Sequence, residues 1–518
     1  MPVNKNDHNW FRFESGWWII VILVAGLAVW SRQIYVGGFS GSDEAVYAMD
    51  GVFVFDFVKA HPAGAGREWA QNYFSRYPCL GIIVSYPPVF AMVEAFFYAI
   101  AGVSVLAARM SVLFFATAGV LAMYWVGRQL YDHASGVLAA GLWASLPSTV
   151  LWSRQVMLEV PATAMLLICC GCYLKYKSSR SILWLALTSV AMVLAVFTSQ
   201  WAMFFGGVLI IDLIKTLKFK KAFSTEHTLA AGASLIVIGA YMVFTFPYAY
   251  SSKFLVRGEL AWRHLISLDH WLFYIKALPD VLSWSMLGLA AVGFLISAST
   301  GQIKKLRIPL LWIVLFYLFA SVIAYKETRY FYLITPAGVL LAVGGLCGGL
   351  EKTRLKQSGT IILGLVMVFQ YLNGWRQNPD RLGDYEVAVR LILASGDANF
   401  VLVDATRDGQ FVFDMRRLQG ADGRVSTIRG SKLLYAHTES DVLSLIANYG
   451  ISYIVVESGP PDIPNWQDVF PRPSQLLRKV LCNRLLFEKL ASYPISENRI
   501  WNNVQMEVYR IKCLNPNS

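Results

Sequence analysis

Long runs of apolar residues, separated by short polar stretches, fill the first three quarters of the chain. Several runs contain about 18 residues or more, enough for an α-helix to cross a hydrocarbon core roughly 30 Å thick. Because a membrane helix satisfies its own backbone hydrogen bonds, the pattern predicts a polytopic α-helical membrane protein. The expected spans lie near residues 17–36, 107–128, 135–150, 157–176, 182–198, 200–217, 228–247, 279–298, 308–324, 328–349 and 358–374.

Lysine and arginine gather in four short polar stretches, around residues 175–180, 215–221, 304–307 and 352–356. The positive-inside rule assigns all four to the cytoplasm, so an even number of spans must separate them. Counting outward predicts about 11–13 spans, an uncleaved first helix with a cytoplasmic N-terminus, and a segment 86–102 that lies at the interface or dips in and returns. The loops 36–106, 151–158 and 248–278 then face outward.

After about residue 378 the pattern changes to helix-then-strand units. The stretch "DYEVAVRLILASGDANFVLVDA" is one such unit, and "HTESDVLSLIANYGISYIVVES" is another. Thr438 or Ser440 is the expected N-cap of the second helix, and Gly450 follows its end. The sequence therefore predicts a transmembrane domain over residues 1–377 and a small extracytoplasmic α/β domain over residues 378–518.

The composition agrees with a membrane protein. The 518 residues are 56% hydrophobic and 15% charged, whereas a soluble domain carries about 25% charged residues. The net charge of +12 comes largely from loop lysines and arginines, so we do not expect a nucleic-acid partner. There is no Walker A motif, which argues against an ATP-driven pump. A disulfide between Cys482 and Cys513 is one alternative for the C-terminal domain.

Two adjacent carboxylates, Asp43 and Glu44, lie in "GSDEAVYAMD" on the first outer loop. Neighbouring side chains on a helix point about 100° apart, so the two acids suit different tasks. One could take a proton from a reacting hydroxyl, and the other could orient the loop or a substrate. The alternative is that Ser42 or Asp43 merely caps the following helix.

Other outer-face motifs carry prolines and charges. "SYPPVFAMVEAFFYAIAG" places Pro87 and Pro88 at a helix start, and "WSRQVMLEVPATAML" places Arg154 and Glu159 at the mouth of a span. These features also fit plain helix starts and membrane anchors. "AYKETRYFYLITPAG" differs, because its cations lie outside, against the positive-inside bias. An Arg/Lys pair of this kind can bind a phosphate by charge-assisted hydrogen bonds.

Taken in order, "DEAVYA", "YPPVFAMVEAFFYAIAG", "GRQLYD", "WSRQVMLEVPATAML" and "KETRYFYLITPAG" resemble motifs of the GT-C superfamily of integral-membrane glycosyltransferases. The nearest branch comprises the protein mannosyltransferases and the lipid A aminoarabinose transferases. The resemblance covers roughly residues 20–375. It implies transfer of a hexosyl or pentosyl group, with inversion, from a polyprenyl-phosphate carrier to an acceptor hydroxyl of a lipid, glycan or protein.

The resemblance also implies roles for individual residues. The catalytic group comprises Asp43, Glu44 and Glu159, and the donor phosphate is expected to contact Lys326, Arg329, Arg154 and Arg76. Tyr86 stands where the family often has a basic residue, so Arg76 or Arg109 would supply that contact. The pocket for donor and acceptor is expected to contain Tyr47, Tyr86, Pro87, Pro88 and Tyr330.

We expect no cofactor to be required. A divalent cation between Asp43 and Glu159 is allowed by their chemistry but is not expected. The expected location is the bacterial inner membrane, with the active site and the C-terminal domain on the periplasmic face. The alternative function is a transporter or flippase of lipid-linked sugars, which would need polar groups within the spans, whereas this chain keeps most charges at helix ends.

Overall fold

The computed structural model describes residues 17–62, 64, 66–82, 86–217, 222–251, 266–323, 326–348, 355–377, 379, 381, 383–458, 472–495 and 504–512. Residues 252–265 of the expected loop 248–278, and Cys513 of the possible disulfide with Cys482, lie outside these residues. The chain divides into two units. Unit 1 comprises Met1–Ile34, Val84–Phe90 and Met110–Asn378, and unit 2 comprises Tyr35–Ile83, Ala91–Arg109 and Pro379–Ser518.

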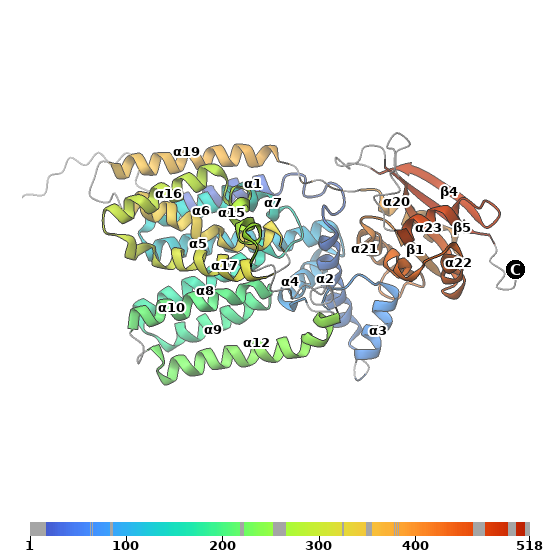
Figure 1. The fold of residues 1–518 in the computed structure, drawn as a ribbon, viewed down its shortest axis with the longest axis horizontal. Coiled ribbons are helices and arrows are strands. Elements are labelled where there is room, and N and C mark those ends of the chain that lie inside the picture. The colour runs from blue at the N-terminus through green and yellow to red at the C-terminus, as the bar shows by residue number, and fades with distance from the viewer. Residues whose placement is uncertain are drawn as a thin grey trace, which may run out of the picture. The chain divides into compact units, whose positions relative to one another are not determined.

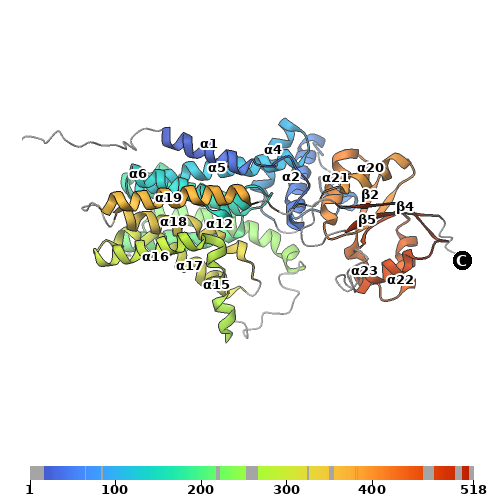
Figure 2. The ribbon, with the colours of Figure 1, turned by 90° about the horizontal axis from the view of Figure 1, so that it is seen from above.

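Unit 1 is helical. Most of its helices lie alongside one another, as Figures 1 and 2 show. In chain order its elements are α1 (Trp17–Trp30), α5 (Val105–Leu130, its first turn in unit 2), α6 (His133–Ser145), α7 (Pro147–Ser153), α8 (Glu159–Ser179), α9 (Ile182–Val196), η1 (Gln200–Phe204), α10 (Phe205–Leu217), α12 (Thr225–Ser251), α15 (Leu268–Leu282), α16 (Trp284–Ser299), η2 (Ile303–Leu306), α17 (Arg307–Val322), η3 (Thr328–Ile334), α18 (Thr335–Val343), η4 (Gly344–Gly348) and α19 (Leu355–Arg376).

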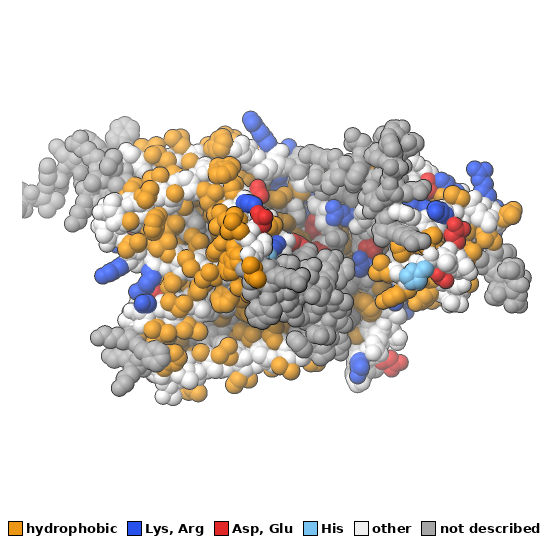
Figure 3. Space-filling view, in the orientation of Figure 1, with side chains coloured by type: hydrophobic (Ala, Val, Ile, Leu, Met, Phe, Trp, Pro, Cys, Tyr) orange, Lys and Arg blue, Asp and Glu red, His pale blue; other side chains and the backbone are white. Residues whose placement is uncertain are grey.

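Many of the helices of unit 1 have the length and composition of membrane spans. Within the described residues, six are long and apolar enough to cross a bilayer, or eight if each of two bent pairs is one span. Three further apolar helices, α1, α4 (Pro88–Ala101) and α9, are shorter. Large apolar side chains are exposed along α12 and α19, and Figure 3 shows hydrophobic side chains gathered over the helices on the face in view. Such a surface suits contact with lipid.

Two predicted elements differ from the structure in shape. The span expected at 135–150 is a pair, α6 and α7, bent by 62°. Pro147 is the first residue of α7, where its missing N–H costs nothing, so the second helix starts there in a new direction. The second pair, α15 and α16, is bent by 107° at Ser283, whose φ is 64°. Residues 268–278, expected in a loop, therefore belong to a helix.

Unit 2 joins the stretch after α1 to the C-terminal domain. The first part holds α2 (Ser42–Ala60), α3 (Gly66–Arg76) and most of α4. The C-terminal elements are α20 (Tyr385–Ser395), β1 (Phe400–Asp404), α21 (Asp408–Gln419), β2 (Ser426–Arg429), η5 (Gly430–Tyr435), α22 (Glu439–Asn448), β3 (Ile451–Ser458), α23 (Arg472–Leu481), β4 (Phe487–Pro494) and β5 (Gln505–Ile511). The loop expected at 36–106 is thus mostly helical.

The C-terminal domain is a five-stranded sheet of order β2-β1-β3-β5-β4. Strand β1 pairs in parallel with β2 and β3, and β5 pairs antiparallel with β3 and β4. Figure 2 shows α20 and α21 on one side of the sheet and α22 and α23 on the other. Buried residues such as Leu402, Val442, Ile454 and Leu477 form the core beneath α22 and α23. The predicted class, a polytopic helical membrane protein with a small C-terminal α/β domain, is confirmed.

Local signals in this domain act as expected. Thr438 is the N-cap of α22, and its side chain accepts a hydrogen bond from the N–H of Asp441 at 3.1 Å. Asp441 reaches back to the N–H of Thr438, which completes a capping box. Gly450, just past the helix end, has a φ of 59°, a conformation that favours glycine.

Candidate active site

The two adjacent acids at the start of α2 have different surroundings. Gly41 occupies the N-cap position, and Ser42 is the first residue of the helix. Glu44 is buried, and its Oε1 accepts hydrogen bonds from the N–H groups of Ser40 at 2.7 Å and Gly41 at 3.0 Å. Asp43 is half-buried at the second position of the helix. Glu44 therefore holds the backbone of its own loop. Asp43 remains the candidate for the general base.

A stripe of polar side chains continues down α2 from Asp43. Tyr47 and Asp50 follow at intervals of four and three residues, which places all three on one face of the helix. Both are buried. Asp50 Oδ1 accepts hydrogen bonds from the N–H groups of Gly81 at 2.7 Å and Ile82 at 2.9 Å. Asp50 therefore ties the segment after α3 to the helix that carries Asp43.

Burial raises the pKa of Asp50 to about 8, and its two backbone hydrogen bonds only partly offset that rise. Between about pH 4 and pH 8, the Asp50 carboxyl stays protonated in the folded protein but is ionised in the unfolded chain. The free energy of unfolding therefore falls as the pH rises from about 4 towards 8. Asp50→Asn keeps an acceptor and stays neutral. We expect Asp50→Asn to be more stable than the natural protein at pH 8, by about 1 kcal/mol or more, and close to it near pH 4.

Thermal unfolding followed by tryptophan fluorescence in detergent at the two pH values checks this prediction. Asp50→Ala is the control, because it removes the acceptor for Gly81 and Ile82 and should be less stable at both pH values. An Asp50→Asn protein that unfolds below the natural protein at pH 8 would contradict the assignment of a costly buried carboxylate.

In unit 1, the start of η3 and the start of α8 bring charged residues together. Glu159 is the first residue of α8, and its Oε1 lies 3.9 Å from the Nε of Arg329. Arg329 also forms an ion pair with Glu327. The side chains of Glu159 and Arg329 are only 10% and 15% exposed, so water screens them weakly. The structure therefore joins two predicted site residues from distant parts of the sequence.

Lys326 caps the C-terminal end of the preceding helix, α17. Its Nζ donates to the carbonyl oxygens of Ala320 and Ser321, each at 2.8 Å, and lies 4.9 Å from the centre of the Tyr274 ring. These contacts hold the ammonium with two of its three N–H donors. Partial burial lowers the pKa of Lys326 to about 8, so its charge titrates just above neutral pH.

If Lys326 binds an anionic phosphate, the interaction is present while the ammonium is protonated and is lost as the pH rises through about 8. We therefore expect kcat/KM for a lipid-linked donor to fall above pH 8, by up to about tenfold per pH unit. Lys326→Arg, which stays charged, should remove this fall. The pH profile of kcat/KM for both proteins is the measurement, and an equal fall in Lys326→Arg would contradict the prediction.

Aromatic rings surround this charged segment. Tyr330 stacks on Trp201 of η1, with ring centres 4.5 Å apart and an interplanar angle of 19°. The guanidinium of Arg329 lies 5.3 Å from the centre of the Tyr330 ring. Stacking and cation–π contact fix the arginine over the ring. Tyr330 thus supports Arg329, in addition to any contact with a ligand.

Arg154 has a different place from the one expected. The residue is buried, and its guanidinium donates to the carbonyl oxygens of Val29, Gly374 and Gln377. It thereby joins the C-terminal ends of α1 and α19 through carbonyl groups at or just beyond the last turn of each helix. Because these donors bind backbone carbonyl groups, Arg154 serves to join helix ends, and its predicted contact with a donor phosphate is not part of the proposed function.

Arg76, Pro87 and Pro88 have structural contacts or positions in the fold. Arg76 ends α3, and its Nη1 donates to the carbonyl oxygen of Ala421 in the C-terminal domain at 2.8 Å. Pro88 starts α4, and Pro87 before it is buried, whereas Tyr86 is half-buried. The N–H of Val89 donates to the carbonyl oxygen of Phe197 at 3.0 Å, which anchors this helix start. Roles for these residues in ligand binding stay predictions.

The described residues contain no group of three or more His, Cys, Asp or Glu side chains arranged to hold a metal ion. The expectation that no cofactor is required stays a prediction.

Comparison with known proteins gives this architecture a family context. Residues 77–255 match the sequence model of the dolichyl-phosphate-mannose-protein mannosyltransferases. The structure is similar to apo ArnT from Cupriavidus metallidurans, with a TM-score of 0.58 and 13% identity over 95% of this chain and 97% of that chain. The chain has the GT-C fold. The predicted resemblance to the GT-C superfamily and to its protein-mannosyltransferase and ArnT-like branch is confirmed.

Two further GT-C structures are similar. The Archaeoglobus fulgidus oligosaccharyltransferase matches with a TM-score of 0.56 and 13% identity over 85% of this chain and 68% of that one. The arabinofuranosyltransferase AftD from Mycobacteria matches with a TM-score of 0.56 and 13% identity, covering 97% of this chain and 40% of AftD. A search of the curated proteins found no match.

Several residues of these sites were not expected from the sequence. Asp50 follows Asp43 at helical spacing, so the spacing could have revealed it. Glu94 on α4 is buried beside Gly51, where a β-carbon would lie 2.5 Å from the β-carbon of Glu94. The only indication of Glu94 in the sequence is that a single glutamate interrupts an otherwise apolar helix. Trp201 is far in sequence from Tyr330, and no local pattern indicates their stacking.

Proposed function

We propose that this GT-C protein is a glycosyltransferase that moves a sugar from a polyprenyl-phosphate-linked donor to an acceptor hydroxyl on the outer face of the membrane, with inversion. The observation that carries the proposal is the GT-C fold over nearly the whole chain, joined to a sequence match to a mannosyltransferase family. A second ArnT structure, 12% identical with a TM-score of 0.56, is bound to undecaprenyl phosphate, which supports a carrier of this type for the present chain.

The leaving group of the proposed reaction is a polyprenyl phosphate. The bond between the anomeric carbon and the phosphate oxygen breaks, and that oxygen keeps the electron pair. Cations fixed nearby stabilise the charge that develops there. We assign this role to Lys326 and Arg329, because neighbouring residues hold both cations in place and neither needs a metal ion to supply its positive charge. We assign the orientation of the guanidinium to Glu327, its nearer ion-pair partner, together with Glu159.

The acceptor oxygen forms the new bond to the anomeric carbon and gives up its proton. We assign Asp43 as the base that receives it, because Glu44 is engaged with the backbone of its own loop while Asp43 is half-buried at the helix start. Positioned general bases typically contribute about 10²- to 10⁴-fold. The products are a glycosylated acceptor and polyprenyl phosphate, so neither a nucleotide nor an oxidant is required.

The donor and the acceptor are to be identified by experiment. Mass spectrometry of lipids that copurify with the protein tests the carrier, and we expect a polyprenyl phosphate or its glycosylated form. A protein that carries only bulk phospholipid, and that gains no thermal stability from added polyprenyl phosphate, would argue against the proposed donor.

The transporter alternative needs charged or polar groups that line a path. Asp212 of α10 is buried, but it is bound to the Nζ of Lys177 at 2.7 Å and to the Nε of Arg307 at 2.5 Å. This compact ion-pair network joins three helices, which is a structural use of a charge at a helix end. It gives no support to a transport path, so we retain the transferase.

A further inference from the structure

The backbone of the segment that leads into Asp43 is held by side chains from several directions. Arg109 of α5 donates to the carbonyl oxygens of Val36 and Gly38, and Arg381 donates to that of Val36 at 2.8 Å. Gln410 of α21 accepts from the N–H of Phe39 at 2.8 Å. Glu44 accepts from the next two N–H groups. We call residues 36–41 the catalytic-loop stem.

Two of these groups, Arg381 and Gln410, come from the C-terminal part of the chain, more than 300 residues away from the stem in sequence. The Phe39 side chain adds a second contact to the same helix, because its ring packs edge-on against Phe413 at 5.1 Å. Phe39 and Gln410 are both buried, so no water competes for the hydrogen bond between them.

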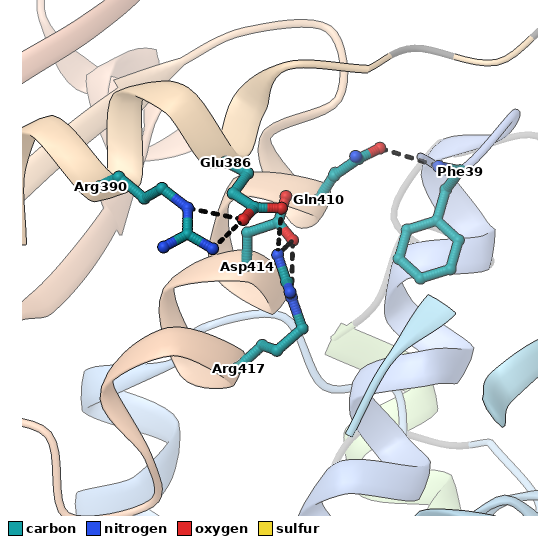
Figure 4. Close-up of polar contacts among 6 residues, drawn as sticks. All are labelled: Phe39, Glu386, Arg390, Gln410, Asp414 and Arg417. Atoms are coloured by element: carbon teal, nitrogen blue, oxygen red, sulfur yellow. Dashed lines mark hydrogen bonds and ion pairs between the residues drawn. The ribbon is translucent and has the colours of Figure 1, made fainter. Parts of the chain in front are cut away.

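The orientation of the Gln410 side chain is itself fixed. Its Oε1 accepts the hydrogen bond from the Phe39 N–H, and Asp414 lies one turn further along α21. Asp414 accepts from Arg417, which pairs with Glu386 of α20 at 2.5 Å. Figure 4 shows these residues behind Gln410, which extends from α21 toward Phe39. A backbone N–H group only donates, so the amide oxygen of Gln410, and not its NH₂ group, must face the stem.

A second contact joins α21 to the C-terminal part of α2. Arg416 of α21 forms a buried ion pair with Asp56, near the end of α2, and its Nε lies 2.6 Å from Oδ2. Tyr73 of α3 donates to the same Asp56 Oδ2 at 2.7 Å. Helix α21 therefore holds both the segment before α2 and the far part of α2. Asp43 lies between these two attachments.

We propose that the C-terminal α/β domain is part of the catalytic apparatus, with Gln410 as a positioning residue that fixes the catalytic-loop stem and thereby aims Asp43. This inference rests on the proposed function, since it takes Asp43 as the base. Precise placement of a base matters because a displacement of about 1 Å can cost roughly 10²-fold in rate. Catalytic side chains need supporting groups that are themselves fixed.

The test replaces Gln410 in the full-length protein by methionine, which has a similar length but no acceptor for the Phe39 N–H. We expect kcat to fall about 10- to 100-fold while KM for the lipid-linked donor changes less than about threefold. Hydrogen–deuterium exchange should speed up in peptides that cover residues 38–44. Gln410→Glu retains the acceptor oxygen, and it should recover a large part of kcat.

Gln419→Met is the matched control. It makes the same replacement on the same helix, but Gln419 hydrogen-bonds Tyr77 and Val425 and does not contact the stem. A purely structural role for Gln410 predicts a lower unfolding temperature with kcat unchanged in the folded fraction, and that result would overturn the proposal. Full activity of Gln410→Met beside an inactive Asp43→Asn would reject the positioning role alone. Full activity of Asp43→Asn would reject Asp43 as the base and the positioning role with it. Failure of the natural protein to transfer any sugar from a polyprenyl-phosphate donor would reject the proposed function itself.

Discussion

Asp43→Asn is expected to lower kcat about 10²- to 10⁴-fold, because an amide cannot take the proton of the acceptor hydroxyl. The amide has nearly the shape of the carboxylate, so α2 and the donor site should be preserved and the donor KM should change little. Initial rates with a labelled polyprenyl-phosphate sugar, measured in detergent or in vesicles, check the prediction.

Glu44→Gln is the matched control for that experiment. Its amide oxygen can still accept from the N–H groups of Ser40 and Gly41, which are the contacts that Glu44 makes in the structure. We expect a fall of less than about tenfold, because the change leaves a hydrogen bond in place. If Glu44→Gln loses as much activity as Asp43→Asn, the division of labour between the two acids would be wrong.

Arg329→Gln is expected to reduce kcat/KM for the donor about 100-fold or more. The guanidinium is charged at every accessible pH and can bind two phosphate oxygens at once, whereas glutamine offers a neutral dipole. Arg329→Lys retains the charge without the paired donors, so we expect an intermediate loss. The affinity for polyprenyl phosphate, measured separately by its effect on thermal unfolding, should fall in the same order.

The control for the arginine is Lys276→Gln on α15. Lys276 is also in unit 1, but its side chain is 65% exposed and it pairs only with the exposed Asp269 among the described contacts. Exposed pairs of this kind contribute little, so kcat/KM should change less than about twofold. Loss of activity in Lys276→Gln as large as in Arg329→Gln would show that the effect is not specific to Arg329.

The sequence predicts the helices of unit 1 well because a membrane span requires a long apolar run, and the pattern reports that requirement directly. The end of α22 was equally predictable, since Thr438 and Gly450 act on neighbouring backbone groups. The bend at Ser283 was not, because its positive φ has no glycine to signal it. The positive-inside rule gives the side on which a loop emerges but not its partners.

The site shows the same limit. Motif order identified Asp43, Glu159, Lys326 and Arg329 as candidates, and the structure brings Glu159 and Arg329 together. The role of Arg154 depends on the carbonyl groups of distant helix ends, which carry no sequence signal. In the same way, nothing in the sequence around Gln410 indicates that its partner is the backbone of Phe39.

The central claim is that one glycosidic bond forms for each polyprenyl phosphate released. The most direct test is a single-turnover reaction of the purified natural protein with a doubly labelled donor, one label in the sugar and one in the lipid phosphate. The account predicts that glycosylated acceptor and free polyprenyl phosphate appear in equal amounts and at the same rate. Movement of the intact donor across a vesicle membrane, with neither product formed, would contradict it.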